Sequence, residues 1–167
     1  MSYQAFYTLA DDYIRHSDAY ISALTDDFIK SRYSGFLAVS AVTVYELCIS
    51  DICINFARRK HKVFGTFVAA KFERLNGRIR LGDVRNHLDS FGDKYRKRFD
   101  RKLGVIERKS LSDGKGSVEQ AYTNILVWRH TFAHEGRPPT NATYDEVKSS
   151  YELGKKVIDC MFQSLRL

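Results

Sequence analysis

The residues best suited to chemistry lie in one short segment, Trp128–Arg137, which reads WRHTFAHEGR. His130 and His134 are four residues apart, so they share one face of a helix, and the long side chain of Arg129 can reach the same space. An arginine offers a bidentate fork to a phosphate, and a histidine can take a proton from a hydroxyl or return one to a leaving oxygen. These groups suffice to cleave RNA with the ribose 2′-hydroxyl as nucleophile, and this chemistry needs neither a metal nor a cofactor.

The elements that must position this segment are predicted to be helices throughout. Apolar residues recur at helical spacing from Tyr3 to about Lys30, which predicts one long amphipathic helix. The step Ser34–Gly35 is expected to end it. The stretch from Phe36 to about Arg58 is apolar on most faces, which predicts a central buried helix. The most apolar stretch, Gly35 to Phe56, is long enough to span a bilayer, but the charges of Glu46 and Asp51 near its middle favour a protein core.

Three shorter helices are predicted before residue 110. Apolar spacing continues from Phe64 to Leu75, and Asn76–Gly77 is expected to end that helix. Asp83 is expected to cap the next piece, which runs through Phe91. The third piece covers Lys94–Leu103, with Gly92 and Gly104 as its limits.

Two capped helices are predicted after a loop over Ser110–Ser117. Ser117 and Gln120 resemble a capping box, so a helix should start at Val118 and run through the WRHTFAHEGR segment until Gly136 and the adjacent prolines stop it. Thr143 and Glu146 form a second capping box that opens a final helix. The chain is therefore expected to be one all-α domain over residues 1–167.

The positive charge of the chain is regional. The whole sequence has a formal net charge of +7, but Arg58 to Lys109 contains 17 Lys or Arg against 6 Asp or Glu. Such an excess favours a polyanionic partner, and aromatic residues are interleaved with it. We therefore predict RNA as the partner. The candidate RNA contacts are Arg96, Lys97, Arg98, Arg101, Lys102 and Arg137.

Composition also limits the class and the location of the protein. Of the 167 residues, 44% are hydrophobic and 28% are charged, as in an ordinary globular domain. The cysteines Cys48, Cys53 and Cys160 are odd in number and form no CxxC pair, which favours a reducing compartment. The N-terminus lacks the features of a signal peptide. The expected location is cytoplasmic, without a membrane partner.

The spacing from Arg129 to His134, at the end of a helix in a small all-α chain, resembles the Rx4-6H motif of HEPN domains. An apolar helix with an internal acid, Glu46, and a final helix after the motif are similar to the stand-alone prokaryotic RiboL-PSP type. His130 departs from the family pattern, in which Asn commonly follows the arginine. The resemblance implies a bundle of four or more main helices with additional short ones.

The resemblance also implies a function and a set of roles. It implies a metal-independent endoribonuclease of a toxin–antitoxin or antiviral defence system. Arg129 would bind and polarise the scissile phosphate, His134 would be the general base or acid, His130 would assist, and Glu46 would orient the arginine or histidine. The implied assembly is a homodimer with a composite active site, restrained by an antitoxin or another defence-system protein.

Two alternatives remain open at this stage. His130 and His134 have the spacing of two zinc ligands on one helix, and His16, His61, His87 or Glu46 could supply a third, but Thr131 replaces the glutamate of an HExxH motif. We therefore predict no metal site. The second alternative is a non-catalytic HEPN module that binds RNA or a protein and regulates a partner. Retention of Arg129 and His134 argues against it.

Overall fold

In the computed structural model, residues 3–73, 77–139 and 142–166 are described, and they are helical without a strand. A short 3-10 turn is followed by seven α-helices, which confirms the all-α prediction. The elements are η1 (Tyr3–Phe6), α1 (Tyr7–Ile21), α2 (Asp27–Lys60), α3 (Lys62–Phe72), α4 (Leu81–Phe91), α5 (Asp93–Ser112), α6 (Val118–Glu135) and α7 (Tyr144–Leu165).

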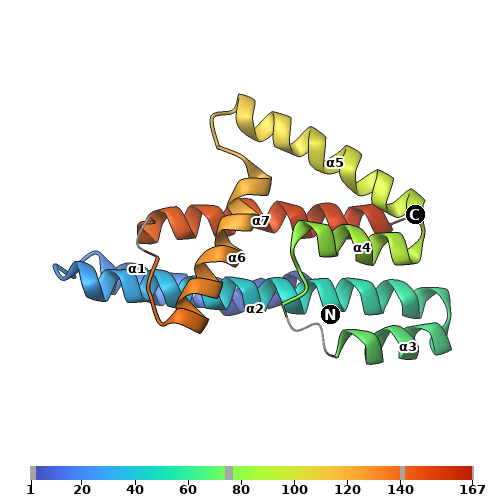
Figure 1. The fold of residues 1–167 in the computed structure, drawn as a ribbon, viewed down its shortest axis with the longest axis horizontal. Coiled ribbons are helices and arrows are strands. Elements are labelled where there is room, and N and C mark those ends of the chain that lie inside the picture. The colour runs from blue at the N-terminus through green and yellow to red at the C-terminus, as the bar shows by residue number, and fades with distance from the viewer. Residues whose placement is uncertain (1–2, 74–76, 140–141, 167) are drawn as a thin grey trace.

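Two long helices, α2 and α7, form the axis of the molecule (Figure 1). The other helices are arranged around them. Helix α6 crosses both, α1 packs along α2, and α3 turns back along the C-terminal part of α2. Helices α4 and α5 cover α7 near its C-terminal end. The C-terminal end of α6 therefore lies near the start of α2, whereas α3, α4 and the start of α5 lie near its end.

A stack of three buried tyrosines joins the central helices. The ring of Tyr45 on α2 stacks on Tyr122 of α6 at 5.1 Å and on Tyr151 of α7 at 5.8 Å. Burial of such hydroxyls is costly unless they are hydrogen bonded. The Tyr45 hydroxyl donates to the carbonyl of Tyr151 at 2.8 Å, and the Tyr122 hydroxyl donates to the carbonyl of Ile79 at 2.6 Å. The stack therefore fixes α6 against α2 and holds the segment before α4 beside both.

The predicted boundary between the first two long helices was wrong. The chain leaves the helix after Ile21, and α2 begins at Asp27, because the Asp26 carboxylate accepts hydrogen bonds from the backbone N–H groups of Phe28 and Ile29. Helix α2 then continues through Ser34–Gly35 without a break. A glycine is tolerated there because another helix approaches its backbone closely.

The three shorter helices predicted before residue 110 are present, but their bounds differ from the predicted ones. Helix α3 ends at Phe72, and the predicted stop at Asn76 lies outside the described residues. At α4 the cap position is Arg80, and Asp83 instead accepts its backbone N–H at 3.0 Å. Helix α5 continues past Gly104 to Ser112, so the predicted loop over Ser110–Ser117 is shorter than expected.

The predicted helix signals on either side of the Arg and His segment are confirmed. The Ser117 hydroxyl accepts the backbone N–H of Gln120 at 3.0 Å, although the Gln120 side chain donates to Asn124 rather than completing a capping box. Gly136 ends α6 in the left-handed conformation, with φ of 66°. Thr143 and Glu146 form the complete capping box of α7.

Helix α2 supplies much of the protein core, as predicted. Within the described part of the chain, it is the helix whose length and apolar composition would allow it to cross a bilayer, and 56% of its most apolar stretch is buried by the rest of the protein. Leu37, Ile49 and Cys53 on this helix are fully or almost fully buried. The same helix places Glu46 among these apolar residues, close to the middle of the bundle.

Candidate active site

The last two turns of α6 bring Arg129, His130 and His134 together on one surface. A guanidinium nitrogen of Arg129, Nη1, lies 3.2 Å from Nε2 of His134. The rings of His130 and His134 are 4.8 Å apart between centroids. Arg129 is half-buried, and both histidines are exposed, so the group is anchored on one side and open to solvent on the other. A phosphate at this surface can contact all three side chains.

The contact between Arg129 and His134 orients the imidazole. A guanidinium has N–H donors and no acceptor, so in this hydrogen bond Nε2 of His134 is the acceptor. The lone pair of Nε2 then points towards the guanidinium. Such a nitrogen is suited to remove a proton from a hydroxyl that lies beside the guanidinium.

Glu46 approaches this group from α2. Its carboxylate lies within the electrostatic influence of Arg129 but does not make an ion pair with it. The backbone N–H of Gly77 faces the carboxylate, and a Cβ placed at Gly77 would lie 3.9 Å from Oε1. Oε1 is nevertheless buried without completing a hydrogen bond to any described residue. The carboxylate is therefore placed to act on Arg129 through its charge.

Burial raises the pKa of Glu46, and the charge of Arg129 and the N–H of Gly77 reduce this rise without cancelling it. The folded protein therefore holds a proton on Glu46 at pH values where the unfolded chain has already lost it. Between the two pKa values the folded state binds more protons, so the contribution of Glu46 to the free energy of unfolding falls as pH rises through this window. Above the window Glu46 is an ionised carboxylate that destabilises the fold.

The start of α2 holds the end of α6 in place. Gly35 allows α6 to approach so closely that a Cβ there would lie about 2.5 Å from Cγ of Phe132. The Arg32 guanidinium donates to the carbonyl of Gly136 at 3.0 Å, beyond the last turn of α6. It also lies over the rings of Phe28 and Phe132. These contacts hold the backbone on both sides of His134.

Arg32, Gly35 and Gly77 are the residues near the site that sequence reasoning missed. Arg32 lies about a hundred positions before the carbonyl that it binds, and no local pattern relates the two. The signal at Gly35 was present but was interpreted as a helix break. Gly77 was interpreted only as a helix stop. Its positive φ of 77° places its N–H beside Glu46.

The predicted RNA contacts do not gather at the Arg and His surface of one chain. Arg137 follows Gly136 and is exposed at the same end of α6. The others lie on α5, whose Tyr95 packs against Phe56 near the far end of α2, at 5.2 Å between ring centroids. With a rise of 1.5 Å per residue, Gly35 and Phe56 are about 30 Å apart along α2. The five predicted contacts on α5 are Arg96, Lys97, Arg98, Arg101 and Lys102.

The basic residues of α5 also differ in how much of their charge is available. Arg96 pairs with Asp89 at 3.3 Å and with Asp93 at 3.1 Å, and Lys97 pairs with Asp93 at 2.6 Å. Arg98 donates to the carbonyl of Arg166 at 3.5 Å. Arg101 is exposed and Lys102 is half-buried. Their side chains have no carboxylate partner within the described chain.

The histidines considered as metal ligands are spread over different parts of the fold. His16 is on α1, and the His61 side chain accepts the backbone N–H of Val63 as the cap of α3. Nε2 of His87 lies 3.0 Å from the carbonyl oxygen of Arg78. Among the residues that the structure describes, no three His, Cys, Asp or Glu side chains form a group that could hold a metal ion.

Comparison with known proteins identifies the family. No curated protein and no solved structure matches the chain significantly. The model of the RiboL-PSP-HEPN family matches residues 6–166, which includes the whole of helices α1 to α7. HEPN domains are commonly ribonucleases and act on RNA. The chain, with its Arg and His pair at the end of α6, therefore belongs to the RiboL-PSP-HEPN family.

Proposed function

We propose that this protein is a metal-independent endoribonuclease that cleaves RNA through attack of the ribose 2′-hydroxyl on the adjacent phosphate. The observation that carries the proposal is the 3.2 Å contact between Nη1 of Arg129 and Nε2 of His134. It places a cation suited to binding phosphate beside an imidazole nitrogen that can accept a proton. Family membership supports the same class of activity, because HEPN domains are commonly ribonucleases.

The proposed reaction uses these groups in sequence. The phosphate replaces His134 as the partner of Arg129, so the guanidinium binds its non-bridging oxygens and stabilises the charge that develops on them. Nε2 of His134 removes the proton of the 2′-hydroxyl, whose oxygen bonds to phosphorus as the bond to the 5′-oxygen breaks. His130 or the protonated His134 then gives a proton to the 5′-oxygen. The products are a 2′,3′-cyclic phosphate and a 5′-hydroxyl.

Glu46 is proposed as a positioning residue for Arg129. Its ionised carboxylate attracts the guanidinium from the α2 side and so limits the directions in which the arginine can point. The half-buried carboxylate destabilises the fold above its raised pKa. Its retention there is consistent with a role other than stability.

The open site also supports a homodimer with a composite active site. His130, His134 and Arg137 are exposed on a single chain, and the neighbouring start of α2 exposes two large apolar side chains, Phe28 at 62% and Phe36 at 53%. Apolar side chains rimmed by polar residues are typical of interaction surfaces. A second copy of the chain would cover these rings and enclose the phosphate. Sedimentation velocity tests this assembly: we expect a dimer that Phe36→Asp dissociates, and a monomeric wild type would contradict it.

The system in which the enzyme acts is proposed from the family resemblance. We place it in a toxin–antitoxin or antiviral defence system, located in the cytoplasm and restrained by a partner protein. The three buried free thiols of Cys48, Cys53 and Cys160 are consistent with a reducing compartment. Expression of wild-type protein should arrest growth, and a variant without His134 should not.

The decisive experiment is cleavage of a mixed RNA pool in excess EDTA, with chemical determination of the new 3′ ends. We expect wild-type protein to leave 2′,3′-cyclic phosphates. His134→Ala should be slower by about 10²–10⁴-fold, as for loss of a general base. Arg129→Ala should lose about 10²–10³-fold, as for loss of a group that stabilises transition-state charge. His16→Ala changes an exposed histidine on α1 and is the matched control.

Two results would overturn the proposal. If folded wild-type protein cleaves no RNA but binds it, the non-catalytic alternative is correct. If His134→Ala cleaves as fast as His16→Ala, the activity belongs to another site or to a contaminant.

A further inference from the structure

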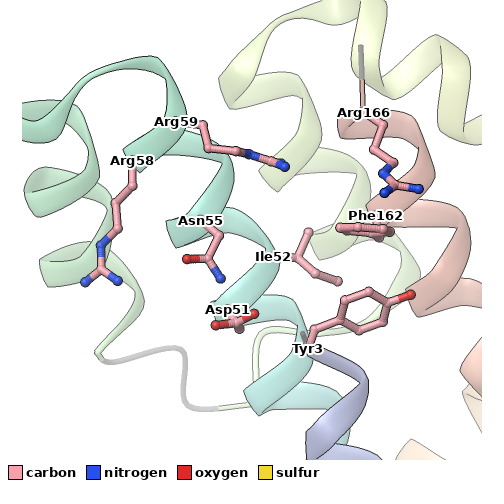
Figure 2. Close-up of a pocket in the computed structure, with 8 residues that line it drawn as sticks. All are labelled: Tyr3, Asp51, Ile52, Asn55, Arg58, Arg59, Phe162 and Arg166. Carbon is pink, nitrogen blue, oxygen red and sulfur yellow. The ribbon is translucent and has the colours of Figure 1, made fainter. Parts of the chain in front are cut away.

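A second cavity lies at the opposite end of α2 from the Arg and His surface. It has a volume of about 550 Å³, is open to solvent, and is lined by η1, the end of α2 and the end of α7. Arg59 and Asn55 enter it from α2, and Arg166 and Phe162 enter it from α7, with Asp51 at its lower edge (Figure 2). Arg59 and Gly35 are about 36 Å apart along α2, at 1.5 Å per residue. This cavity is therefore separate from the proposed cleavage site.

The arginines of this cavity have no carboxylate partner. Arg58, Arg59 and Arg166 line it, and none of them makes an ion pair within the described residues, whereas Arg85, Arg96 and Lys155 elsewhere in the fold each pair with a carboxylate. Asp51 is the single acidic residue in the lining. An adjoining cavity of about 280 Å³ shares Arg59 and Arg166 and adds Lys60. Like charges brought together repel one another, so an anion between them would be stabilising.

Packing restricts two of these arginines before any ligand binds. The Arg166 guanidinium lies over the ring of Phe162, 4.8 Å from its centroid. The stem of Arg58 is covered by α3 at Gly65, where an added Cβ would lie 2.9 Å from the Arg58 Cα. Side chains that are already restricted lose less conformational entropy when they bind. Such planar guanidinium groups match the oxygens of a phosphate.

The remaining walls favour a ligand larger than inorganic phosphate. The volume is within the range of small-molecule sites, which is about 300–1,000 Å³. Tyr3, Ile52 and Phe162 give the cavity apolar surface, and Asn55 and Asp51 supply an amide and a carboxylate. Apolar surface suits a base, and the amide and carboxylate can hydrogen bond to base edges or ribose hydroxyls.

We propose that this cavity binds a phosphorylated nucleotide, with Arg59 and Arg166 on the phosphate and Arg58 at the margin. The nucleotide can be free or can belong to an RNA chain, because the chemistry of recognition is the same. Binding at this cavity does not require cleavage at Arg129 and His134. The two proposals can therefore fail independently.

Calorimetric titration of the wild-type protein with AMP and ATP tests the free form, with adenosine as the ligand that lacks a phosphate. A short RNA in which every ribose carries a 2′-O-methyl group tests the chain form, since it cannot undergo attack by the 2′-hydroxyl. Measurable binding of AMP or ATP identifies a free nucleotide as ligand. Binding of the RNA without binding of AMP or ATP identifies a nucleotide within a chain, provided that Arg59→Gln and Arg166→Gln weaken it.

Variants assign the binding to the cavity. We expect Arg59→Gln and Arg166→Gln each to weaken the observed binding by about tenfold or more, as for loss of a charge-assisted hydrogen bond. Arg15→Gln changes an exposed arginine on α1 by the same chemistry and should leave binding unchanged. Thermal unfolding of each variant checks that the fold is intact.

The inference is overturned by either of two results. The first is binding of nucleotide and RNA that is the same for Arg59→Gln, Arg166→Gln and Arg15→Gln. The second is adenosine binding as tightly as AMP, since the arginines would then contact no phosphate. None of these measurements depends on cleavage, so an inactive Arg129 and His134 site would leave the effects of Arg59→Gln and Arg166→Gln on binding unchanged.

Discussion

Gly35→Ala is the sharpest test of how the fold positions the Arg and His surface. The new methyl group would lie about 2.5 Å from Cγ of Phe132 and closer still to Cδ2 and Cε2. Carbon atoms in contact are normally about 3.5–4.0 Å apart, so the ring or the helix must move by about 1 Å. Phe132 lies between Arg129 and His134 on α6, so this movement should change the geometry of the proposed site.

The expected change in stability is the balance of two terms. Overpacking of this kind costs about 1–3 kcal/mol. Replacing a helical glycine by alanine contributes about 0.5–1 kcal/mol in the other direction. The net loss in the free energy of unfolding is therefore about 1 kcal/mol, equivalent to about 2–4 °C in Tm for a chain of this size.

Gly82→Ala is the matched control for this loss. Gly82 also lies in a helix, α4, and an added Cβ would meet no atom within 4 Å. Only the backbone term remains, so this variant should be more stable than the wild type by about 0.4–1 kcal/mol. Urea unfolding of both variants measures the difference.

A double-mutant cycle identifies the cause of the loss. Phe132→Ala removes Cγ and the whole ring, so Gly35→Ala in that background should be neutral or stabilising. RNA cleavage by Gly35→Ala, measured well below its Tm, should fall even though no proposed catalytic group has changed. The reasoning is refuted if Gly35→Ala is as stabilising as Gly82→Ala, or if its loss persists without the Phe132 ring.

Four further outcomes follow from the structure. Glu46→Gln should raise the free energy of unfolding at neutral pH, because the amide carries no charge for burial to destabilise. It should also make the free energy of unfolding fall less as pH rises; urea unfolding at several pH values would contradict this if the curves of the variant and the wild type were parallel. Thr143→Ala should lose about 1 kcal/mol in urea unfolding because it removes the cap of α7, and Thr143→Ser should retain it. Tyr122→Phe should lose about 1–3 kcal/mol, since the buried carbonyl of Ile79 loses its donor, and thermal unfolding unchanged by the substitution would disprove that role. RNA binding measured by fluorescence anisotropy should weaken steeply with salt if the Arg58–Lys109 region contacts phosphates, and salt-insensitive binding would exclude such contacts.

Helices and their caps were predictable where the signal was local. Ser117, Gly136 and Thr143 act on backbone groups within a few residues, so short patterns identify them. The same reasoning failed at Gly35, because the packing against α6 that this glycine permits outweighs its low helix propensity. A local signal for the true boundary existed at Asp26, which caps α2, but the apolar spacing across it dominated the interpretation.

The charge of the Arg58–Lys109 region could be counted from the sequence, but its distribution in space could not. Asp89 and Asp93 form ion pairs with Arg96 and Lys97, which are close to them in sequence. The resulting decrease in available positive charge could therefore have been predicted from the sequence. That Arg59 and Arg166 line the same cavity could not be predicted from the sequence, because it depends on how α2 and α7 pack.

By itself the sequence determined the helical class of the fold, both ends of α6, the start of α7 and the placing of Arg129 beside His134. These features depend on hydrogen bonds and spacings within one helix, which are the same wherever that helix lies. Only the tertiary structure decided that Arg32 holds the end of α6, that Glu46 acts on Arg129 through its charge without an ion pair, and that the arginine cavity lies at the far end of α2. The physical reason is that such contacts join segments distant in the chain, and their geometry depends on the packing of whole helices around the buried tyrosine stack.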